Sequence, residues 1–164
     1  MLGELTLEEI DELLRSEAVG RIGCYGFGRL YVVPVTYAYD GVAVYCHSRE
    51  GLKLRMMRSN PTVCFEVDRV DGIADWRSVI ATGRFSELEA MEAELAMQLL
   101  QRRIAPLVPS ATSAPDSRIH ASGHPWSVFR IVLGERSGRF ERSPSDRRRE
   151  DAVESASPAG ESAL

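Results

Sequence analysis

Cysteine and histidine are scarce in this 164-residue chain, which has three of each. The cysteines, Cys24, Cys46 and Cys64, stand far apart, and their spacing fits no zinc-binding pattern. Their odd number argues against the paired disulfides of a small secreted scaffold. Each lies among apolar or aromatic residues, so we expect the three to be packed in strands. We therefore expect no metal site.

Long apolar runs and a strong net charge are also missing. No apolar stretch approaches the roughly 20 residues of a membrane span, and the acidic N-terminus does not resemble a secretory signal. The net charge is −4, so no broad basic surface for nucleic acid is expected. With 44% hydrophobic and 27% charged residues, the composition is ordinary for a soluble domain. We expect a cytoplasmic protein without a nucleic-acid or membrane partner.

Six segments have the β-branched and aromatic composition of strands. Gly26-Phe27-Gly28 and Asp40-Gly41 have the residue types of tight turns, and they separate the first three segments. Pro34 cannot donate a hydrogen bond to a neighbouring strand, so it marks a sheet edge or a gap against which a ligand lies. The predicted strands are 19–25, 30–39, 42–47, 62–70, 76–85 and 126–133, and a turn is expected at Ser137-Gly138.

Three helices are expected beside these strands. Thr6 with Glu9 and Ser86 with Glu89 form capping-box patterns, which predict helices over 7–16 and from Ser86 to about 103. A helix over about 49–59, with Ser48 as N-cap, should end before Asn60-Pro61. The stripe Leu88, Met91, Leu95 and Leu99 on the long helix is expected to be a core or dimer contact.

The composition changes at residue 143 to Ser, Pro, Ala, Arg and Glu. Such a segment cannot bury enough apolar surface to offset its chain entropy. We therefore expect one domain over 1–142 and a disordered tail over 143–164. Short, consecutive strands joined by tight turns predict a mainly β fold with flanking helices, a six-stranded antiparallel barrel. A barrel this small fills with its own side chains, so a flat cofactor must bind outside it.

The segment from Tyr45 to Lys53 carries the strongest functional signal of the residues themselves. A β-type run ends at Ser48, and a helix-forming segment with an early lysine, Lys53, begins there. Backbone N–H groups at a helix start are unpaired, and the helix dipole adds positive charge, so such a junction can hold a phosphate. A plain N-cap followed by a solvated lysine also explains the pattern.

Several further motifs stand in a recognisable order. They are residues 28–37 (GRLYVVPVTY), 45–48 (YCHS), 51–53 (GLK), 60–61 (NP), 63–67 (VCFEV), 76–79 (WRSV) and 129–131 (FRI). Through them the chain resembles the pyridoxamine 5′-phosphate oxidase-like superfamily over roughly residues 5–142. Within it, the chain is most similar to the branch of the nitroimidazole-resistance (Nim) proteins. The resemblance implies a split β-barrel homodimer with one FMN per subunit at the interface.

The resemblance also implies which residues bind the cofactor. The flavin ring would lie along the strand that contains Val33, Pro34, Val35 and Thr36. The ribityl chain and phosphate would lie beside Cys46, His47 and Ser48, with Lys53 paired to the phosphate. The flavin would also be approached by Trp76, Arg77 and Ser78, a contact that the partner subunit can supply.

The expected activity is that of an NAD(P)H-dependent flavin oxidoreductase acting on a small acceptor. Leu52 stands where full pyridoxamine phosphate oxidases carry an arginine, which argues against that oxidase activity itself. His47 is the candidate catalytic acid or base, because the pKa of histidine lies near neutrality. Two other interpretations stay open: a flavin carrier or sensor without turnover, and a barrel that binds a deazaflavin or haem.

Overall fold

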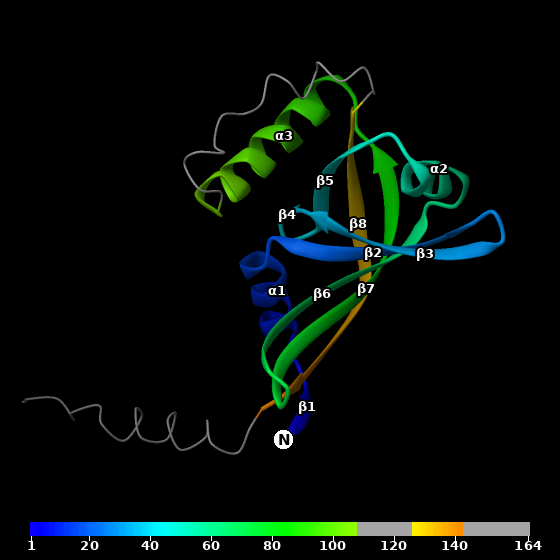
Figure 1. Cartoon of the computed structure of the whole chain (residues 1–164). Helices are drawn as coiled ribbons and strands as arrows, with labels where there is room; N and C mark the ends of the chain where they lie inside the picture. The colour runs from blue at the N-terminus through cyan, green and yellow to red at the C-terminus, as the bar shows by residue number, and fades with distance from the viewer. Residues whose placement is uncertain (108–125, 143–164) are drawn as a thin grey trace, which may run out of the picture.

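The computed structural model describes residues 1–107 and 126–142 of the chain, so the tail predicted over 143–164 lies outside the described residues. Figure 1 shows a curled antiparallel sheet flanked by helices. In chain order the elements are β1 (Leu2–Glu4), α1 (Leu7–Ser16), β2 (Val19–Gly26), β3 (Arg29–Thr36), β4 (Ala38–Tyr39), β5 (Ala43–Arg49), α2 (Leu52–Ser59), β6 (Thr62–Gly72), β7 (Asp75–Glu87), α3 (Ala90–Ile104), the 3-10 turn η1 (Ala105–Leu107) and β8 (Trp126–Glu141).

The strand order makes the sheet a split barrel. The order is β3-β2-β6-β7-β8-β5-β4, and β1 pairs with the far end of β8. β3 and β4 stand at opposite ends of this order, yet only Tyr37 separates them along the chain. The sheet must therefore curl until its two ends meet, although no ladder in the described residues closes it. The predicted six-stranded split barrel is confirmed: six strands are long, and β1 and β4 have three and two residues.

Tyr37 explains why the predicted strand 30–39 is divided in two. Its side chain is fully buried, and its hydroxyl donates to the carbonyl of Leu14 at 2.9 Å. Its backbone N–H donates to the carbonyl of Ala18 at 3.0 Å, which lies outside the ladder. The predicted Asp40-Gly41 hairpin is confirmed, because it joins β4 to β5 with Gly41 at φ +106.

Pro34 lies on a sheet edge, as one of its two interpretations required. β3 pairs only with β2, and Pro34 stands opposite Arg21 in that ladder. A proline on an edge strand leaves no donor unpaired inside the sheet. The β2–β3 turn itself is formed by Phe27 and Gly28, both at positive φ (54 and 75).

α1 packs against the core as the capping box predicts. The Thr6 hydroxyl accepts from the Glu9 N–H at 3.2 Å, and the Glu9 carboxylate accepts from the Thr6 N–H at 2.8 Å. Its buried face is formed by Ile10, Leu13 and Leu14. These residues belong to one core cluster that also contains Tyr37, Phe65, Phe129, Met56, Met57 and Cys46.

The turn predicted at Ser137-Gly138 is wrong, because β8 runs straight through both residues. A Cβ on Gly138 would come within 2.9 Å of the Cβ of Leu5, so this glycine admits the segment before α1. The backbone N–H of Leu5 also donates to the carbonyl of Gly138 at 2.9 Å. The glycine therefore serves close packing inside a long strand.

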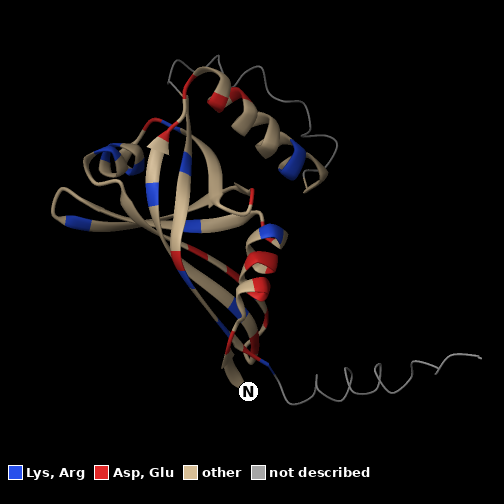
Figure 2. Cartoon of the chain, turned by 180° about the vertical axis from the view of Figure 1, so that it is seen from behind, with Lys and Arg blue, Asp and Glu red and all other residues tan. Residues whose placement is uncertain are grey.

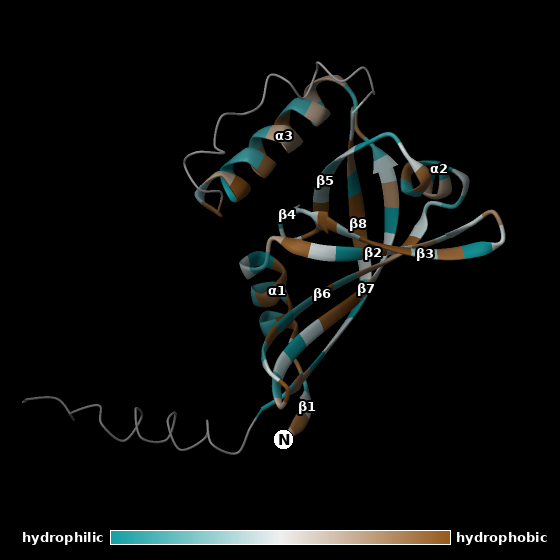
Figure 3. Cartoon of the chain, viewed as in Figure 1, coloured by the Kyte–Doolittle hydropathy of each residue, from teal (hydrophilic) through white to brown (hydrophobic). Residues whose placement is uncertain are grey.

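The capping box predicted at Ser86 is also wrong. β7 continues to Glu87, and α3 begins at Ala90 without a side-chain cap. The helix packs through Ala96 and Leu100, whereas Met91 and Leu95 are 73% and 58% exposed. The stripe over 88–99 is therefore not a core contact of this chain, except at Leu88. Figure 3 shows apolar segments along α3, which lies apart from the main core.

Candidate functional site

The junction of β5 and α2 differs in detail from the expectation. Ser48 is not an N-cap: it lies inside β5, is buried, and donates through its hydroxyl to the carbonyl of Arg49 at 3.0 Å. The helix begins three residues later than predicted, with Gly51 as N-cap and no side-chain capping bond. No acidic residue lies in its first turn, and its charged side chains are all basic (Figure 2). The Glu50 carboxylate accepts from the Gly51 N–H, but no side chain caps the N–H groups after Gly51, so these can bind an anion.

Lys53 is half-buried in that first turn. Burial lowers the pKa of its amine, and the nearby thiols of Cys46 and Cys24 act in the opposite direction. No carboxylate within residues 1–107 and 126–142 pairs with it. A partly desolvated ammonium without a counter-charge is unfavourable, and a phosphate would relieve that cost.

His47 points to the other face of β5 from Cys46. Its ring stacks on Trp126, with centroids 4.9 Å apart and planes 16° apart. Its Nδ1 atom is buried and has no hydrogen-bond partner in the described part of the chain. Burial lowers the pKa of the imidazole, so the ring is neutral at neutral pH. Buried polar atoms are normally paired, so this nitrogen is a candidate ligand contact.

Cys46 contributes packing to this junction. It is fully buried in the core cluster, and burial raises the pKa of its thiol to about 12. The thiol is therefore protonated and unreactive at neutral pH. Of the three predicted neighbours of the phosphate on β5, Cys46 and Ser48 face the interior and His47 faces outward.

Arg58 anchors the same helix, although no local sequence pattern marks it. It donates two bonds to Glu50 at 2.8 Å each and two bonds to Glu87 at 2.7 and 2.8 Å. Glu87 also accepts from the hydroxyl of Ser127 at 2.6 Å. Arg58 lowers the pKa of Glu87 to about 2. The network fixes α2 against the ends of β7 and β8.

The predicted ring-facing strand is the free edge of the sheet. Val35 is buried and Val33 half-buried, whereas Pro34 and Thr36 are exposed on the opposite face. One side of β3 has no strand partner among the described residues, so backbone groups there are open to a ligand or to a second chain.

Trp76, Arg77 and Ser78 lie at the opposite end of the molecule from α2. The register places Trp76 beside Glu141, which in turn pairs with Leu2, and the indole donates to Glu141 at 3.1 Å. Figure 1 shows the β6–β7 turn near β1 and the N-terminus, far from α2. These three residues line a shallow cleft of about 430 Å³ with Arg21, Glu66 and Asp68. One chain therefore does not bring them to the β5–α2 junction.

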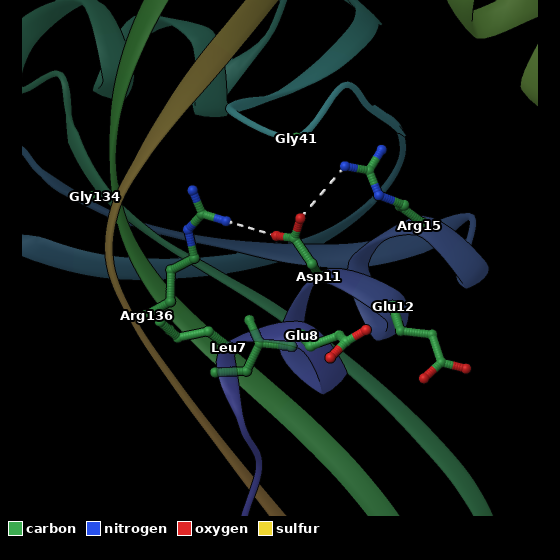
Figure 4. Close-up of a pocket in the computed structure, with 9 residues that line it drawn as sticks. Leu7, Glu8, Asp11, Glu12, Arg15, Gly41, Gly134 and Arg136 are labelled. Atoms are coloured by element: carbon green, nitrogen blue, oxygen red, sulfur yellow. Dashed lines mark hydrogen bonds and ion pairs between the residues drawn. The ribbon is translucent and has the colours of Figure 1, made fainter.

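A further cleft, of about 770 Å³, lies beside α1 (Figure 4). Asp11 accepts there from Arg136 at 2.9 Å and from Arg15 at 3.3 Å. The Tyr39 hydroxyl donates to the same carboxylate at 2.8 Å. Burial, and then this hydrogen bond, raise the pKa of Tyr39 to about 12. These groups satisfy one another, so the cluster ties α1 to β4 and β8.

The sequence from residue 6 to residue 140 matches the family profile described as pyridoxamine 5′-phosphate oxidase. That match spans nearly all of the described barrel. The chain belongs to the pyridoxamine 5′-phosphate oxidase family. The resemblance inferred from the motifs between residues 28 and 131 is thereby confirmed.

The chain is also similar in sequence or fold to individual known proteins. An FAD-binding protein from Mesorhizobium loti is 29% identical, with a TM-score of 0.71 over 87% of this chain and 98% of its own. A 5-nitroimidazole antibiotic resistance protein from Bacteroides thetaiotaomicron shares the fold at 20% identity, with a TM-score of 0.66 over 85% and 87%. An uncharacterized protein from Rhizobium meliloti (strain 1021) is 35% identical over 88 residues, which are 54% of this chain and 58% of that protein.

The described ranges contain neither a helix suited to crossing a membrane nor a metal-binding cluster. None of their helices combines the length and apolar character that a membrane span requires. Likewise, residues 1–107 and 126–142 contain no group of three His, Cys, Asp or Glu side chains arranged to hold a metal ion.

Proposed function

We propose that this family member is an FMN-binding flavoprotein and a homodimeric oxidoreductase of a small molecule. The observation that carries the proposal is the pair of unpartnered groups at the β5–α2 junction, His47 and Lys53. Within the described ranges, the imidazole Nδ1 is buried without a hydrogen bond, and the half-buried amine has no carboxylate partner. Both groups can bind acceptor oxygens, and a phosphate provides several.

Family membership supports a flavin as the ligand. The Mesorhizobium loti relative, at 29% identity, is named as an FAD-binding protein. FMN is favoured over FAD because residues 45–53 resemble the phosphate-binding motif of FMN proteins in this superfamily. The uncapped start of α2 adds backbone N–H donors at the same place.

Each group at the site has a distinct role in this proposal. Lys53 and the first N–H groups of α2 hold the phosphate, and His47 donates to a phosphate or ribityl oxygen. The backbone of Val33 to Thr36 on the free edge of β3 contacts the polar side of the ring. The bound flavin supplies hydride transfer between a reduced nicotinamide and an acceptor. His47, being neutral, can accept a proton there at neutral pH.

A second copy of the chain completes the proposed site. Tyr25, Leu30 and Val32 lie on the outer face of the β2–β3 hairpin and are 52%, 80% and 66% exposed. A contiguous apolar surface of this kind is typical of an interface. In a dimer formed through this surface, residues 76–78 of one subunit would approach the flavin bound to the other subunit.

The absorption spectrum of purified protein supplied with FMN tests the proposal. We expect peaks near ~375 and ~450 nm that bleach when NADPH or NADH is added. Protein that takes up no FMN would overturn the proposal. A bound flavin that resists both nicotinamides would leave a carrier or sensor in place of an oxidoreductase.

A further inference from the structure

We propose a second ligand site, which takes a small amphipathic carboxylate, in the pocket between α3 and the outer face of β5 and β8. The pocket has a volume of about 300 Å³. Its apolar wall is formed by Leu88, Leu95 and Leu99, and its polar wall by Tyr45, Arg102 and Arg130. This inference goes beyond the proposed flavin site, because it uses none of the groups assigned to the flavin.

The pocket exists because α3 packs incompletely on the sheet. Ala96 and Leu100 of α3 are buried, but Leu95 of the same helix, which lines the pocket, remains 58% exposed. The floor is formed by Tyr45 and Arg130, which stand directly opposite each other in the β5–β8 ladder. An apolar ligand body in this gap would remove the exposed leucine surface from water, which is favourable.

The charges of the pocket select an anion. Among the residues that the structure describes, Arg102 bonds only the carbonyl of Gln98, at 3.3 Å, and has no carboxylate partner. Arg130 donates to the hydroxyl of Ser86 at 3.3 Å and lies 3.5 Å from Glu92, the pocket's one carboxylate. Two guanidinium groups therefore share one pocket carboxylate, which pairs with Arg130, and both have donors left. A ligand carboxylate can accept from such a fork with two oxygens.

The pocket and the proposed phosphate site use different binding groups. Tyr45, in the pocket, and His47, at the phosphate site, lie on the same outer face of β5, because side chains alternate along a strand. Of these two, only Tyr45 lines the pocket. Lys53 and the start of α2 do not line the pocket. Loss of one ligand should therefore leave the other bound.

Calorimetric titration of the full chain with octanoate tests this proposal, with 1-octanol as the uncharged ligand of the same length. We expect octanoate to bind at least tenfold more tightly than 1-octanol. Arg102→Gln should weaken octanoate about tenfold, as loss of a charge-assisted bond does, and Leu95→Gln should weaken both ligands. Met91→Gln is the matched control, since Met91 is 73% exposed on the same helix and does not line the pocket.

Three results of these titrations, and a fourth given below, would overturn the proposal. They are no binding of octanoate, equal binding of octanoate and 1-octanol, and equal effects of Leu95→Gln and Met91→Gln. The last result, together with a change in oligomeric state, would assign the helix face to a contact between two copies. Octanoate binding that survives Lys53→Gln separates this site from the flavin site, and binding abolished by Lys53→Gln would contradict it.

Discussion

The imidazole of His47 stacks on the indole of Trp126, with ring centroids 4.9 Å apart and planes 16° apart. The contact joins β5, at the proposed phosphate site, to the first residue of β8, and Arg49 lies 5.3 Å from the centre of the same indole. The stack fixes an imidazole whose buried Nδ1 has no partner within the described residues. Rigid placement of an unpaired polar atom lowers the cost of binding a ligand that pairs with it.

Replacement of His47 by phenylalanine should have opposite effects on stability and on flavin binding. The ring stack is kept, while the unpaired buried nitrogen is removed, so the flavin-free protein should gain about 1 kcal/mol in its free energy of unfolding. FMN should bind more weakly, because one donor is lost. Urea unfolding without flavin and an FMN titration measure the two effects. A variant that is less stable and binds FMN unchanged would show that His47 is a packing residue only.

The same histidine should make stability depend on pH. Burial lowers its pKa in the folded state below the ordinary value of 6.5, so the unfolded chain binds this proton more readily. Its contribution is therefore fully present above pH 6.5 and is lost as the pH falls towards the folded-state pKa. Flavin-free wild-type protein should lose more stability over that window than His47→Phe does. Parallel curves for the two proteins would contradict the assignment.

Glu87→Gln should remove the ion pair that joins β7 to α2 and lower the free energy of unfolding. Arg58 lowers the pKa of Glu87 to about 2, so the pair stabilises the fold above pH 4.5, and that stability is lost as the pH falls towards 2. Because both side chains are about one-third exposed, we expect a loss of only about 1 kcal/mol at pH 7. Urea unfolding at several pH values measures it. Glu94→Gln, an exposed carboxylate on α3, is the control and should change nothing.

Two glycines of β2 should respond differently to alanine. A Cβ on Gly20 would lie 2.5 Å from the ring of Phe65 and 2.8 Å from the carbonyl oxygen of Glu66. A Cβ on Gly23 would meet its nearest atom, in Cys64, at 3.5 Å. We expect Gly20→Ala to cost about 1–3 kcal/mol, as overpacking does, and Gly23→Ala to be tolerated. Equal melting temperatures for the two variants would show that Phe65 and the backbone of Glu66 can move to admit a Cβ at Gly20.

Local patterns predicted the elements that depend on local chemistry. The capping box of Thr6 and the Asp40-Gly41 hairpin both formed, because the side-chain bonds that set them join residues two or three positions apart. The turn expected at Gly138 did not form, because that glycine lies in a strand, where it packs closely against Leu5, a residue distant in sequence. Ser86 likewise stayed in β7, where its hydroxyl accepts from Arg130. Such contacts are tertiary and leave no local signal.

The sequence predicted which segment forms the candidate site, but not which contacts its side chains make. The phosphate motif pointed to residues 45–53, and the helix start open to an anion is there, at Gly51. The N-cap role expected of Ser48 was wrong, because the alternation of β5 turns its side chain inward, where it donates to the Arg49 carbonyl. Arg58 was missed, since its carboxylate partners, Glu50 and Glu87, lie 8 and 29 residues away.

The central claim is that the β5–α2 junction holds the phosphate of a flavin, with Lys53 as its counter-charge. Fluorescence titration with FMN and with riboflavin, which lacks the phosphate, tests this directly on the wild type and on Lys53→Gln. Arg55→Gln, which removes an exposed charge from the same helix, is the control. We predict that the wild type and Arg55→Gln bind FMN more tightly than riboflavin by about 1.5–3 kcal/mol or more, and that Lys53→Gln loses about that amount for FMN alone. Equal affinity of the wild type for FMN and riboflavin, or an unchanged FMN affinity in Lys53→Gln, would contradict the claim.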